Sequence, residues 1–348
     1  MSDMPIDSPA PNTPIASTPV ISVVLPVYNS ERYLRKALAS LRWQTFPHWE
    51  AICVNDGSTD GSLAILEDYA AADPRFRVIS QPNSGIVAAL NRGLFESRCE
   101  WVARMDSDDI ATPDRFARQI ETVRADPLLV LLGGAVTTID PEDDPLRTLR
   151  YPTDHNSIEA SLLRGDAPIA HPTVLMRREA ALQVGGYRPA CEWVEDMDLW
   201  LRLARVGRLA NLADPVLRYR LHTSSVCWTR RAEQRERMQQ VLGDAHSERG
   251  LAPPPEAPPV QSKPLSDARG KWARSAARAG RLRVAAKWAG RLAAEKPLSG
   301  QTLRVGAETL LRSAVSFATG KRERLDPLPD WRQWDCLAVN PKSASKAA

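Results

Sequence analysis

Three carboxylates lie within four positions of the segment MDSDD, where Asp106, Asp108 and Asp109 follow the mostly apolar run WVARM. Like charges this close repel one another, and burying them is costly unless a cation compensates. Oxygen ligands suit Mg²⁺ and Mn²⁺, and such a cation can bind and neutralise a diphosphate. The alternative is a turn that caps a helix, since Thr112 and Pro113 are typical of a helix start. A position directly after a strand favours the metal site.

Two other loops carry polar residues that could bind a nucleotide. Asp56, in VNDGSTD, follows an apolar run, and its carboxylate could accept a hydrogen bond from a base N–H. Asp, Gly and Ser also favour turns for local reasons, so a purely structural turn is the alternative. In QPNSG, Asn83 is followed by Gly85, a residue that lets the backbone approach a ligand closely.

The elements that must position these residues alternate between strand and helix patterns. The runs ISVVLPV, EAICV, FRVIS and WVARM predict strands, with apolar residues at helical spacing between them. Ser30 is placed to cap the first helix. This alternation predicts an α/β fold with a Rossmann-like, mostly parallel central sheet flanked by helices. Right-handed crossovers would then bring Asn29, Asp56 and Asp106–Asp109 to one edge of the sheet.

Composition divides the chain into regions. Residues 1–19 are rich in Pro, Ser and Thr and predict a disordered arm, followed by an α/β domain at 20–250. Six prolines between 253 and 264 indicate a linker at 251–266, and helical patterns at 267–296 and 301–317 predict a helical C-terminal region over 267–348. Within 113–250, LLVLLGG predicts a strand, HPTVLMRREAALQVGGYRP a strand and a helix that stops at Gly-Gly, and MDLWLRLARVG a helix.

The overall composition excludes several classes of protein. The 348 residues are 43% hydrophobic and 25% charged, as in ordinary globular domains. The N-terminus lacks a secretory pattern, and the longest apolar run, LLVLLGGAV, is too short to span a bilayer. Five cysteines without a CxxC pair argue against a disulfide framework or a zinc site. A reducing, cytoplasmic location is therefore expected.

Charge is distributed unevenly along the chain. Residues 251–348 contain 18 Lys and Arg against 8 Asp and Glu, whereas the first 250 residues contain 28 against 34. Residues 268–294 carry eight Lys and Arg and no acid. One interpretation is a basic helical surface that rests on anionic lipid. The other is a helical hairpin packed on the α/β domain; nucleic acid is not expected, because no reading motif accompanies the charge.

Together the motifs resemble those of the family 2 glycosyltransferases, which are inverting enzymes of the GT-A fold. The resemblance covers about residues 20–225 and is carried, in order, by ISVVLPVYN, VNDGSTDGS, NSGIVAALNRGL, MDSDD, GGYRP and EDMDLWLRL. It implies that the nucleotide-sugar contacts Pro26, Tyr28, Asn29, Asp56, Asn83 and Gly85. It also implies that Asp106 and Asp108 contact the ribose and a Mn²⁺ or Mg²⁺ ion that bridges the diphosphate. Many members have arginine before the asparagine of the third motif, where this chain has Leu90 before Asn91.

The pair Glu195–Asp196 begins the helix of EDMDLWLRL. Acids at a helix N-terminus also interact favourably with its dipole, which we expect to keep Asp196 ionised. The resemblance implies that Asp196 is the catalytic base, which takes the proton of the acceptor hydroxyl. It also implies that Glu195 lies in the donor site.

Further candidates surround this pair. Arg220 and His222, in YRLHTSS, could meet phosphate oxygens, and His222 could also bind the metal. His171 could line the acceptor side or only pack. Trp193 and Trp200 flank the acid pair; either could stack on a sugar ring, and Trp200 could equally belong to the core.

These observations predict a metal-dependent inverting glycosyltransferase that moves a sugar from a nucleotide-sugar, UDP-linked by expectation, to a hydroxyl group. The expected acceptor is a saccharide or a lipid-linked molecule in polysaccharide or glycolipid synthesis, with peripheral attachment to the inner face of the membrane as one option. A nucleotidyltransferase is the second hypothesis, although LPVYNSERY lacks its glycine-rich loop. A non-catalytic nucleotide-sugar-binding protein is the third.

Overall fold

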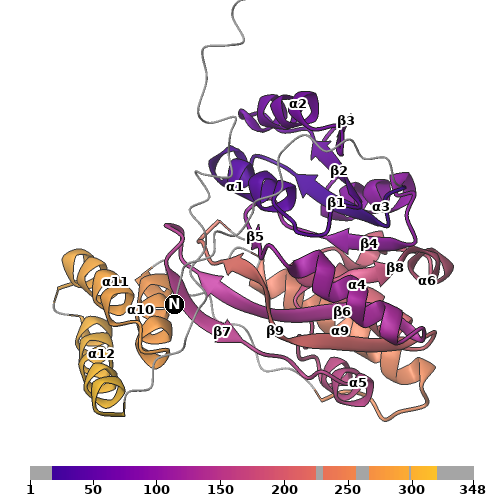
Figure 1. Ribbon diagram of the computed structural model, residues 1–348. Helices are drawn as coiled ribbons and strands as arrows, with labels where there is room; N and C mark the ends of the chain where they lie inside the picture. The colour runs from indigo at the N-terminus through magenta and orange to yellow at the C-terminus, as the bar shows by residue number, and fades with distance from the viewer. Residues whose placement is uncertain (1–17, 225–229, 256–265, 298, 320–348) are drawn as a thin grey trace, which may run out of the picture.

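The computed structural model describes residues 18–224, 230–255, 266–297 and 299–319 (Figure 1). Most of the predicted N-terminal arm therefore lies outside the described residues. The first elements alternate as predicted: β1 (Ile21–Val27), α1 (Glu31–Arg42), β2 (Trp49–Asp56), α2 (Ser62–Ala72), β3 (Phe76–Gln81), α3 (Ile86–Glu96) and β4 (Trp101–Arg104). The next elements are β5 (Ile110–Ala111), α4 (Arg115–Ala125), β6 (Leu129–Ile139), β7 (Pro145–Leu149), α5 (His155–Leu163), η1 (His171–Thr173), β8 (Leu175–Arg177), α6 (Arg178–Gln183), η2 (Pro189–Cys191), α7 (Glu195–Leu203), β9 (Arg208–Arg220) and α9 (Arg231–Glu248).

The strands form one sheet of nine strands in the order β3-β2-β1-β4-β8-β6-β9-β5, with β7 paired to β6. The first four strands are parallel, as predicted. Beyond β4 the sheet is mixed, because β8 runs antiparallel to both of its neighbours while β6 and β9 run parallel to each other. The strand–helix alternation on which the prediction of a mostly parallel sheet rests ends at residue 104, and the parallel half ends there too.

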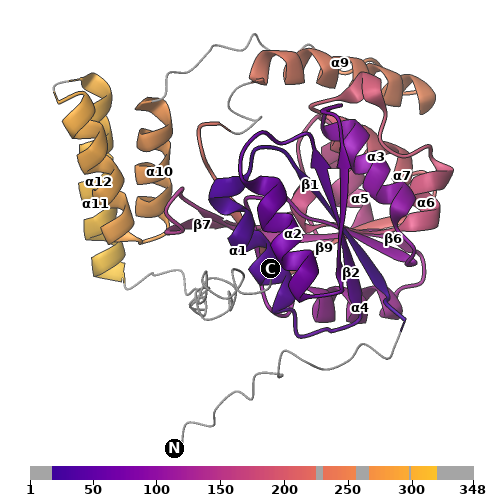
Figure 2. The ribbon, with the colours of Figure 1, turned by 90° about the horizontal axis from the view of Figure 1, so that it is seen from above.

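Helices cover both faces of the sheet. Along β1, Val23 and Leu25 join one apolar cluster together with Leu34 of α1, whereas Val24 joins another together with Leu90 of α3. This period-two alternation is the geometry of a strand whose two faces are both buried. Figure 2 shows α1 and α2 on one side of the sheet and α3, α6 and α7 on the other.

The loops after β1, β2 and β4 meet at one edge, as the parallel order requires. The Ser30 hydroxyl lies 2.7 Å from the Ser107 hydroxyl, and the side-chain oxygen of Asn29 accepts a hydrogen bond from the Thr59 N–H at 2.8 Å. Ser30 does occupy the N-cap position of α1, but its side chain makes no capping bond. The prediction of a side-chain cap was wrong because that hydroxyl bonds to Ser107, which ties the first loop to the acidic one.

Three helices follow the proline-rich segment: α10 (Ser266–Arg278), α11 (Leu282–Glu295) and α12 (Gly300–Thr319). They match the predicted helices and stand beside β7 (Figures 1 and 2). Leu146 of β7 lies in the same apolar cluster as Trp272, Trp288 and Leu292. The basic region therefore packs on the α/β domain. None of the helices in the described part of the chain combines the length and apolar character needed to cross a bilayer.

Asn91 of α3 holds the turn that follows α6. Its amide nitrogen donates to the Tyr187 carbonyl at 2.7 Å, and its oxygen accepts from the Tyr187 N–H at 3.0 Å. Gly186 has a φ of 63°, and a Cβ there would lie 2.8 Å from the Asn91 oxygen. The asparagine of the third motif thus fixes the turn of the GGYRP motif, which leads to α7.

Replacement Asn91→Ala should lower the free energy of unfolding by about 1–3 kcal/mol, because it leaves both polar groups of the Tyr187 backbone unpaired. Arg92→Ala is the matched control, since the Arg92 side chain is 49% exposed and pairs only at the surface with Glu96. Urea unfolding of both variants measures the difference. Equal stability of the two would contradict a structural role for Asn91.

Candidate active site

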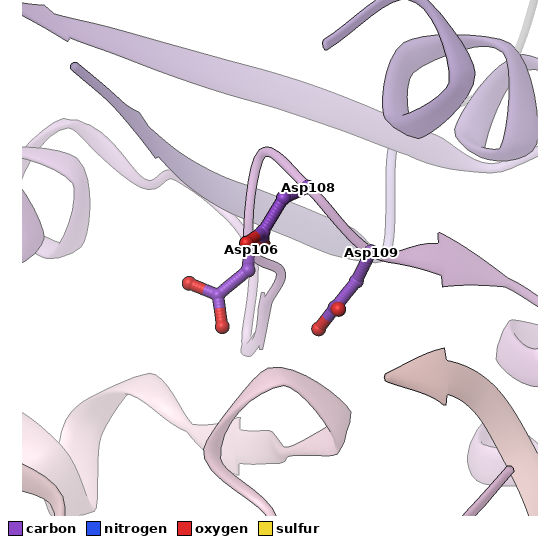
Figure 3. A group of neighbouring side chains, drawn as sticks. All are labelled: Asp106, Asp108 and Asp109. Atoms are coloured by element: carbon purple, nitrogen blue, oxygen red, sulfur yellow. The ribbon is translucent and has the colours of Figure 1, made fainter. Parts of the chain in front are cut away.

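The loop between β4 and β5 carries the three predicted acids. Asp106, Asp108 and Asp109 project from one loop toward a common region (Figure 3). One oxygen of each lies within 4.8 Å of an oxygen of the others. The helix-cap alternative is wrong, because Asp114 occupies the N-cap position of α4.

Each of the three carboxylates has a different partner. Asp106 forms an ion pair with the buried Arg104, and an oxygen of Asp108 lies 2.7 Å from Nε2 of His222. One oxygen of Asp109 accepts the backbone N–H of Arg220 at 2.8 Å. Its other oxygen is buried and has no hydrogen-bond partner among the described residues.

The local balance of charge favours a cation. Burial raises the pKa of Asp106, and burial together with the Asp108 carboxylate raises the pKa of Asp109 well above its ordinary value. Both shifts mean that negative charge here is under-compensated by protein groups. Clustered carboxylate oxygens, one of them buried and unpaired, fit a hard divalent cation such as Mg²⁺ or Mn²⁺.

Arg220 supports this loop from behind. Its Nε donates to the Asp108 carbonyl at 2.7 Å, its Nη1 lies 2.5 Å from a carboxylate oxygen of Asp143, and its guanidinium lies 4.3 Å from the Tyr33 ring centroid. The side chain is 0% exposed. The expectation that Arg220 contacts phosphate was therefore wrong, because burial behind the loop removes it from the ligand side.

His222 contacts the same loop through the Asp108 carboxylate. Its Nδ1 is 2.7 Å from the Ser224 hydroxyl, and its ring packs against Tyr33 with centroids 5.7 Å apart. Nε2 therefore contacts the acidic loop at Asp108, while Nδ1 is held by Ser224 of the same segment. The following residues 225–229 lie outside the described residues.

Asp56 lies at the end of β2 and organises the third loop. Its Oδ1 accepts from the Gln81 side chain at 2.8 Å and from the Ser84 N–H at 2.9 Å, and its Oδ2 accepts from the Gly85 N–H at 3.0 Å. The structural role is therefore real. A carboxylate offers about four acceptor positions, so one on Oδ2 takes no bond from these groups, and the residue as a whole is buried.

The rest of the predicted nucleotide site surrounds Asp56. Pro26 is buried within β1, while Tyr28 is 51% exposed at the mouth of the site. Asn29 adopts a left-handed backbone with a φ of 48°. Gly57 has a φ of 72°, and a Cβ there would lie 2.6 Å from the Asn83 nitrogen. Only glycine lets the second and third loops approach this closely.

The first turn of α7 holds three acids in different environments. Asp198 is buried and forms an ion pair with Arg202. Glu195 is buried, and its Oε2 finds no hydrogen-bond partner in the part of the chain that the structure describes. Asp196 is partly exposed, and one of its oxygens accepts the Met197 N–H at 2.8 Å. Of the three, Asp196 is therefore the acid that a substrate can reach.

Burial dominates the titration of the acid pair. It raises the pKa of Glu195 to about 7, with a further contribution from the Asp196 carboxylate, and it also raises the pKa of Asp196. Desolvation therefore acts on Asp196 in the direction opposite to the helix dipole. Arg104 lowers the pKa of both acids and also pairs with Asp106, so one buried guanidinium serves both halves of the site.

The aromatic candidates separate into packing and site residues. Trp200 is fully buried and meets His171 edge-on, with ring centroids 5.5 Å apart. Nε2 of His171 lies 3.0 Å from the Tyr187 hydroxyl, and burial lowers the His171 pKa well below its ordinary value. Both residues therefore pack. Trp193 is partly exposed and has a φ of 75°, which is strained for a bulky residue, just before the acid pair.

Sequence reasoning missed three residues that shape the site: Arg104, Tyr33 and Asp143. Arg104 had a visible signal, since it is the one charged residue in the strand sequence WVARM. Tyr33 follows the pattern of an ordinary helix residue. Asp143 lies in a turn, and its contact with Arg220 spans 77 positions of sequence.

Comparison with known proteins identifies the family. Residues 22–185 match the model described as Glycosyl transferase family 2. The chain is 35% identical over 211 residues to the amylovoran biosynthesis glycosyltransferase AmsE of Erwinia amylovora, an alignment that covers 60% of this chain and 78% of that one. The chain belongs to glycosyltransferase family 2. This assignment removes the nucleotidyltransferase hypothesis.

Solved structures agree on the fold of this family 2 glycosyltransferase. S. aureus TarS 1-349 in complex with UDP-GlcNAc matches with a TM-score of 0.53 and 18% identity, over 88% of this chain and 94% of that one. The mannosyltransferase PcManGT from Pyrobaculum calidifontis, in complex with GDP-Man and Mn²⁺, matches with a TM-score of 0.50 and 19% identity, over 92% of both chains. The fold is GT-A, as the sequence motifs predicted.

The raised pKa of Glu195 predicts a pH-dependent stability. The folded protein retains a proton on this carboxyl between its ordinary pKa of 4.5 and about 7, whereas the unfolded chain releases it. Stability therefore falls as pH rises through this window. Glu195→Gln removes the effect, so the variant should gain stability over the parent as pH rises from 5 to 8, by up to about 3 kcal/mol.

Urea unfolding at pH 5, 6, 7 and 8 measures this gain. The exposed Glu67→Gln on α2 serves as control and should follow the parent at every pH. Parallel curves for the parent and Glu195→Gln would contradict the raised pKa.

Proposed function

We propose that this protein is a metal-dependent inverting glycosyltransferase that transfers a sugar from a UDP-linked donor to a hydroxyl group. One observation carries the proposal: Arg104 pairs with Asp106 of the acidic loop and acts on the Glu195–Asp196 pair of α7. The buried guanidinium of Arg104 therefore lies close enough to influence both the donor-side aspartates and the acceptor-side acid Asp196. TarS with UDP-GlcNAc and PcManGT with GDP-Man and Mn²⁺ support a nucleotide-sugar and a divalent ion.

Asp106 and Asp108 would hold the divalent ion, Mn²⁺ or Mg²⁺, with the unpaired oxygen of Asp109 beside them. When bound, the ion supplies a positive charge that neutralises the departing diphosphate. His222 fixes the Asp108 side chain from the outside and is placed to meet the donor phosphates. Arg104 orients Asp106 and leaves its other oxygen for the ribose or the metal.

The nucleotide would lie over the loops that follow β1, β2 and β3. The remaining acceptor position on Asp56 suits the imide N–H of uracil, and the TarS complexes with UDP and UDP-GlcNAc support a UDP-linked donor. Tyr28 and Asn83 are exposed beside it and supply contact surface, and Pro26, Asn29 and Gly85 fix the backbone of this surface.

Asp196 would act as the general base on the acceptor. It takes the proton of the acceptor hydroxyl as that oxygen forms a bond to the anomeric carbon. The bond from this carbon to the diphosphate breaks at the same time, and UDP leaves with the electron pair. A raised pKa suits this role, because a base is most effective when its pKa approaches the working pH.

Glu195, buried beside the base, would keep the donor side of α7 polar, and the strained Trp193 would stack on a sugar ring. We propose a saccharide or lipid-linked acceptor used in polysaccharide or glycolipid synthesis. The relatives AmsE, named for amylovoran biosynthesis, and TuaG of Bacillus subtilis, named as a putative teichuronic acid biosynthesis glycosyltransferase, support this acceptor class.

We also propose that α12 attaches the protein to an anionic membrane surface. Leu303, Leu310 and Leu311 share one side of this helix and are 63%, 74% and 68% exposed, opposite the buried Val305. Arg304 and Arg312 are exposed on the same helix. An apolar stripe flanked by arginines is the pattern of a helix that lies in the lipid interface. Much of the basic charge on α10 and α11, by contrast, is paired with acids.

The roles of Asp108 and Asp196 predict different defects. Asp108→Asn should weaken UDP binding in the presence of Mn²⁺ and lower transfer with it, and EDTA should have the same effect on the parent. Asp196→Asn should retain UDP affinity and lose roughly 10²–10⁴-fold in transfer rate, because its interaction forms only in the transition state. Titration calorimetry and a sugar-transfer assay measure both.

Asp68→Asn, on the outer surface of α2, is the matched control and should behave as the parent. A folded Asp196→Asn protein that transfers sugar at the parent rate would exclude this base, and Glu195 would be next, since Asp198 is occupied by Arg202. A parent protein that binds UDP without any transfer or donor hydrolysis would favour the non-catalytic alternative.

The membrane proposal predicts co-sedimentation of the full-length protein with vesicles that contain anionic phosphatidylserine at low salt. Vesicles of neutral phosphatidylcholine alone should bind less, because the arginines then lack a partner. Leu310→Glu should abolish binding, whereas Leu128→Glu, at a similarly exposed leucine of the α/β domain, should not. Equal sedimentation of the two variants, or none for the parent, would contradict it.

A further inference from the structure

We infer that helix α11 positions the acidic loop of the active site, acting through the turn between β6 and β7. Lys287, Trp288 and Arg291 of α11 hold this turn, which we call the acidic turn, residues 140–144. The acidic turn contacts the guanidinium of Arg220 through Asp143 and the Asp140 carbonyl. Arg220 then bonds to Asp108 and Asp109 of the acidic loop. The inference rests on the proposed function only for the role of the acidic loop, which is to hold the divalent ion.

The acidic turn carries four carboxylates that need cations nearby. It places Asp140, Glu142, Asp143 and Asp144 within five positions, and like charges this close repel one another. Lys287 contacts the carboxylates of Asp140 and Asp144. Arg291 pairs with Glu142. The helix therefore supplies the cations that pair with Asp140, Glu142 and Asp144.

Asp140 is the centre of the turn. Its side chain is 0% exposed, and its Oδ1 accepts the N–H groups of Glu142 at 2.8 Å and of Asp144 at 3.0 Å. Its Oδ2 accepts the indole N–H of Trp288 at 2.7 Å. A buried carboxylate costs stability unless each oxygen is satisfied, so the shape of the turn depends on α11.

Two groups of the acidic turn, the Asp143 carboxylate and the Asp140 carbonyl, hold the Arg220 guanidinium in place. Asp143 adopts a left-handed backbone with a φ of 73° and pairs with Arg220, while Lys36 of α1 contacts its other oxygen. The Asp140 carbonyl accepts from the same guanidinium at 3.2 Å. Because the Arg220 side chain is wholly buried, water cannot replace these contacts if the turn moves.

Arg220 contacts the loop that carries the proposed metal ligands. Its Nε donates to the Asp108 carbonyl, and its backbone N–H donates to the Asp109 carboxylate. A displaced acidic turn would shift the guanidinium and with it the backbone at Asp108. Lys287 and Trp288 touch no reacting group, so they are positioning residues.

The test compares Trp288→Phe and Lys287→Met with Arg269→Gln in the full-length protein. The ring centroids of Trp288 and Trp272 are 4.5 Å apart. Trp288→Phe keeps an aromatic ring against Trp272 but removes the indole N–H donor. Within the described residues, Arg269 pairs with Glu295 of the helical region and not with the acidic turn, so its variant controls for a general loosening of these helices.

Hydrogen exchange without added metal is the first measurement. The amides of 106–111 and of Arg220 should exchange about ten-fold faster in Trp288→Phe and Lys287→Met, the size expected when one charged hydrogen bond is lost. The amides of β1 to β3 should be unchanged, and Arg269→Gln should match the parent throughout. Unchanged exchange at 106–111 in a folded Trp288→Phe variant would overturn the inference.

The affinity for Mn²⁺ alone is the second measurement, and it should fall by about ten-fold in the two test variants. A parent that binds no Mn²⁺ would refute the metal part of the proposed function, while the exchange comparison would still decide whether α11 positions the loop. A parent that binds Mn²⁺, with test variants that bind it equally and exchange equally, would refute the inference alone.

Discussion

The repulsion among three carboxylates on one short loop is the constraint on which much of this structure depends. Two buried arginines act on this loop from different elements. Arg104 at the end of β4 pairs with Asp106. Arg220 at the end of β9 donates from its guanidinium to the Asp108 carbonyl and from its backbone N–H to the Asp109 carboxylate. A third, Arg115 of α4, is fully buried and donates to the Arg104 carbonyl at 2.8 Å. Burial lowers its pKa to about 9, which still leaves it charged at neutral pH.

The mixed half of the sheet brings residues of a distant strand to this charged loop. Strand β9 pairs along β6 and then reaches β5, directly after the acidic loop. This path brings the Arg220 guanidinium to the Asp108 carbonyl and the His222 ring to the Asp108 carboxylate. A sheet that continued in parallel βα units would place helices there instead. The antiparallel return is therefore what allows a distant strand to enclose the donor side of the site.

Local patterns predicted the parts of the site whose geometry is set within about thirty residues. The strand-ending acids, the Asp56 turn and the helix of Glu195 all follow from periodicity and turn chemistry. The same patterns failed where a partner is remote. Ser30 bonds to Ser107 instead of capping its helix, and Arg220 pairs with Asp143 instead of a phosphate, because in both cases tertiary contacts decide.

The C-terminal region illustrates the same limit through its charge. In the sequence its basic residues look like one surface, because the acids that neutralise them are far away: the contact between Lys287 and Asp140 spans 147 positions. No window of helical periodicity can detect such a pair. What the composition did predict correctly is the helices themselves, since their alanine, leucine and tryptophan spacing is local.

The long separation between α11 and the turn it holds also orders events during synthesis. The chain leaves the ribosome from its N-terminus at about 5–20 residues per second, so β1 to β4 and the acidic loop emerge on the order of ten seconds or more before Trp288. The parallel half of the sheet can form in that interval. The acidic turn, however, must wait for α11 before Asp140, Glu142 and Asp144 meet the cations that pair with them. The nascent protein thus completes its scaffold first and fixes its most highly charged loop last.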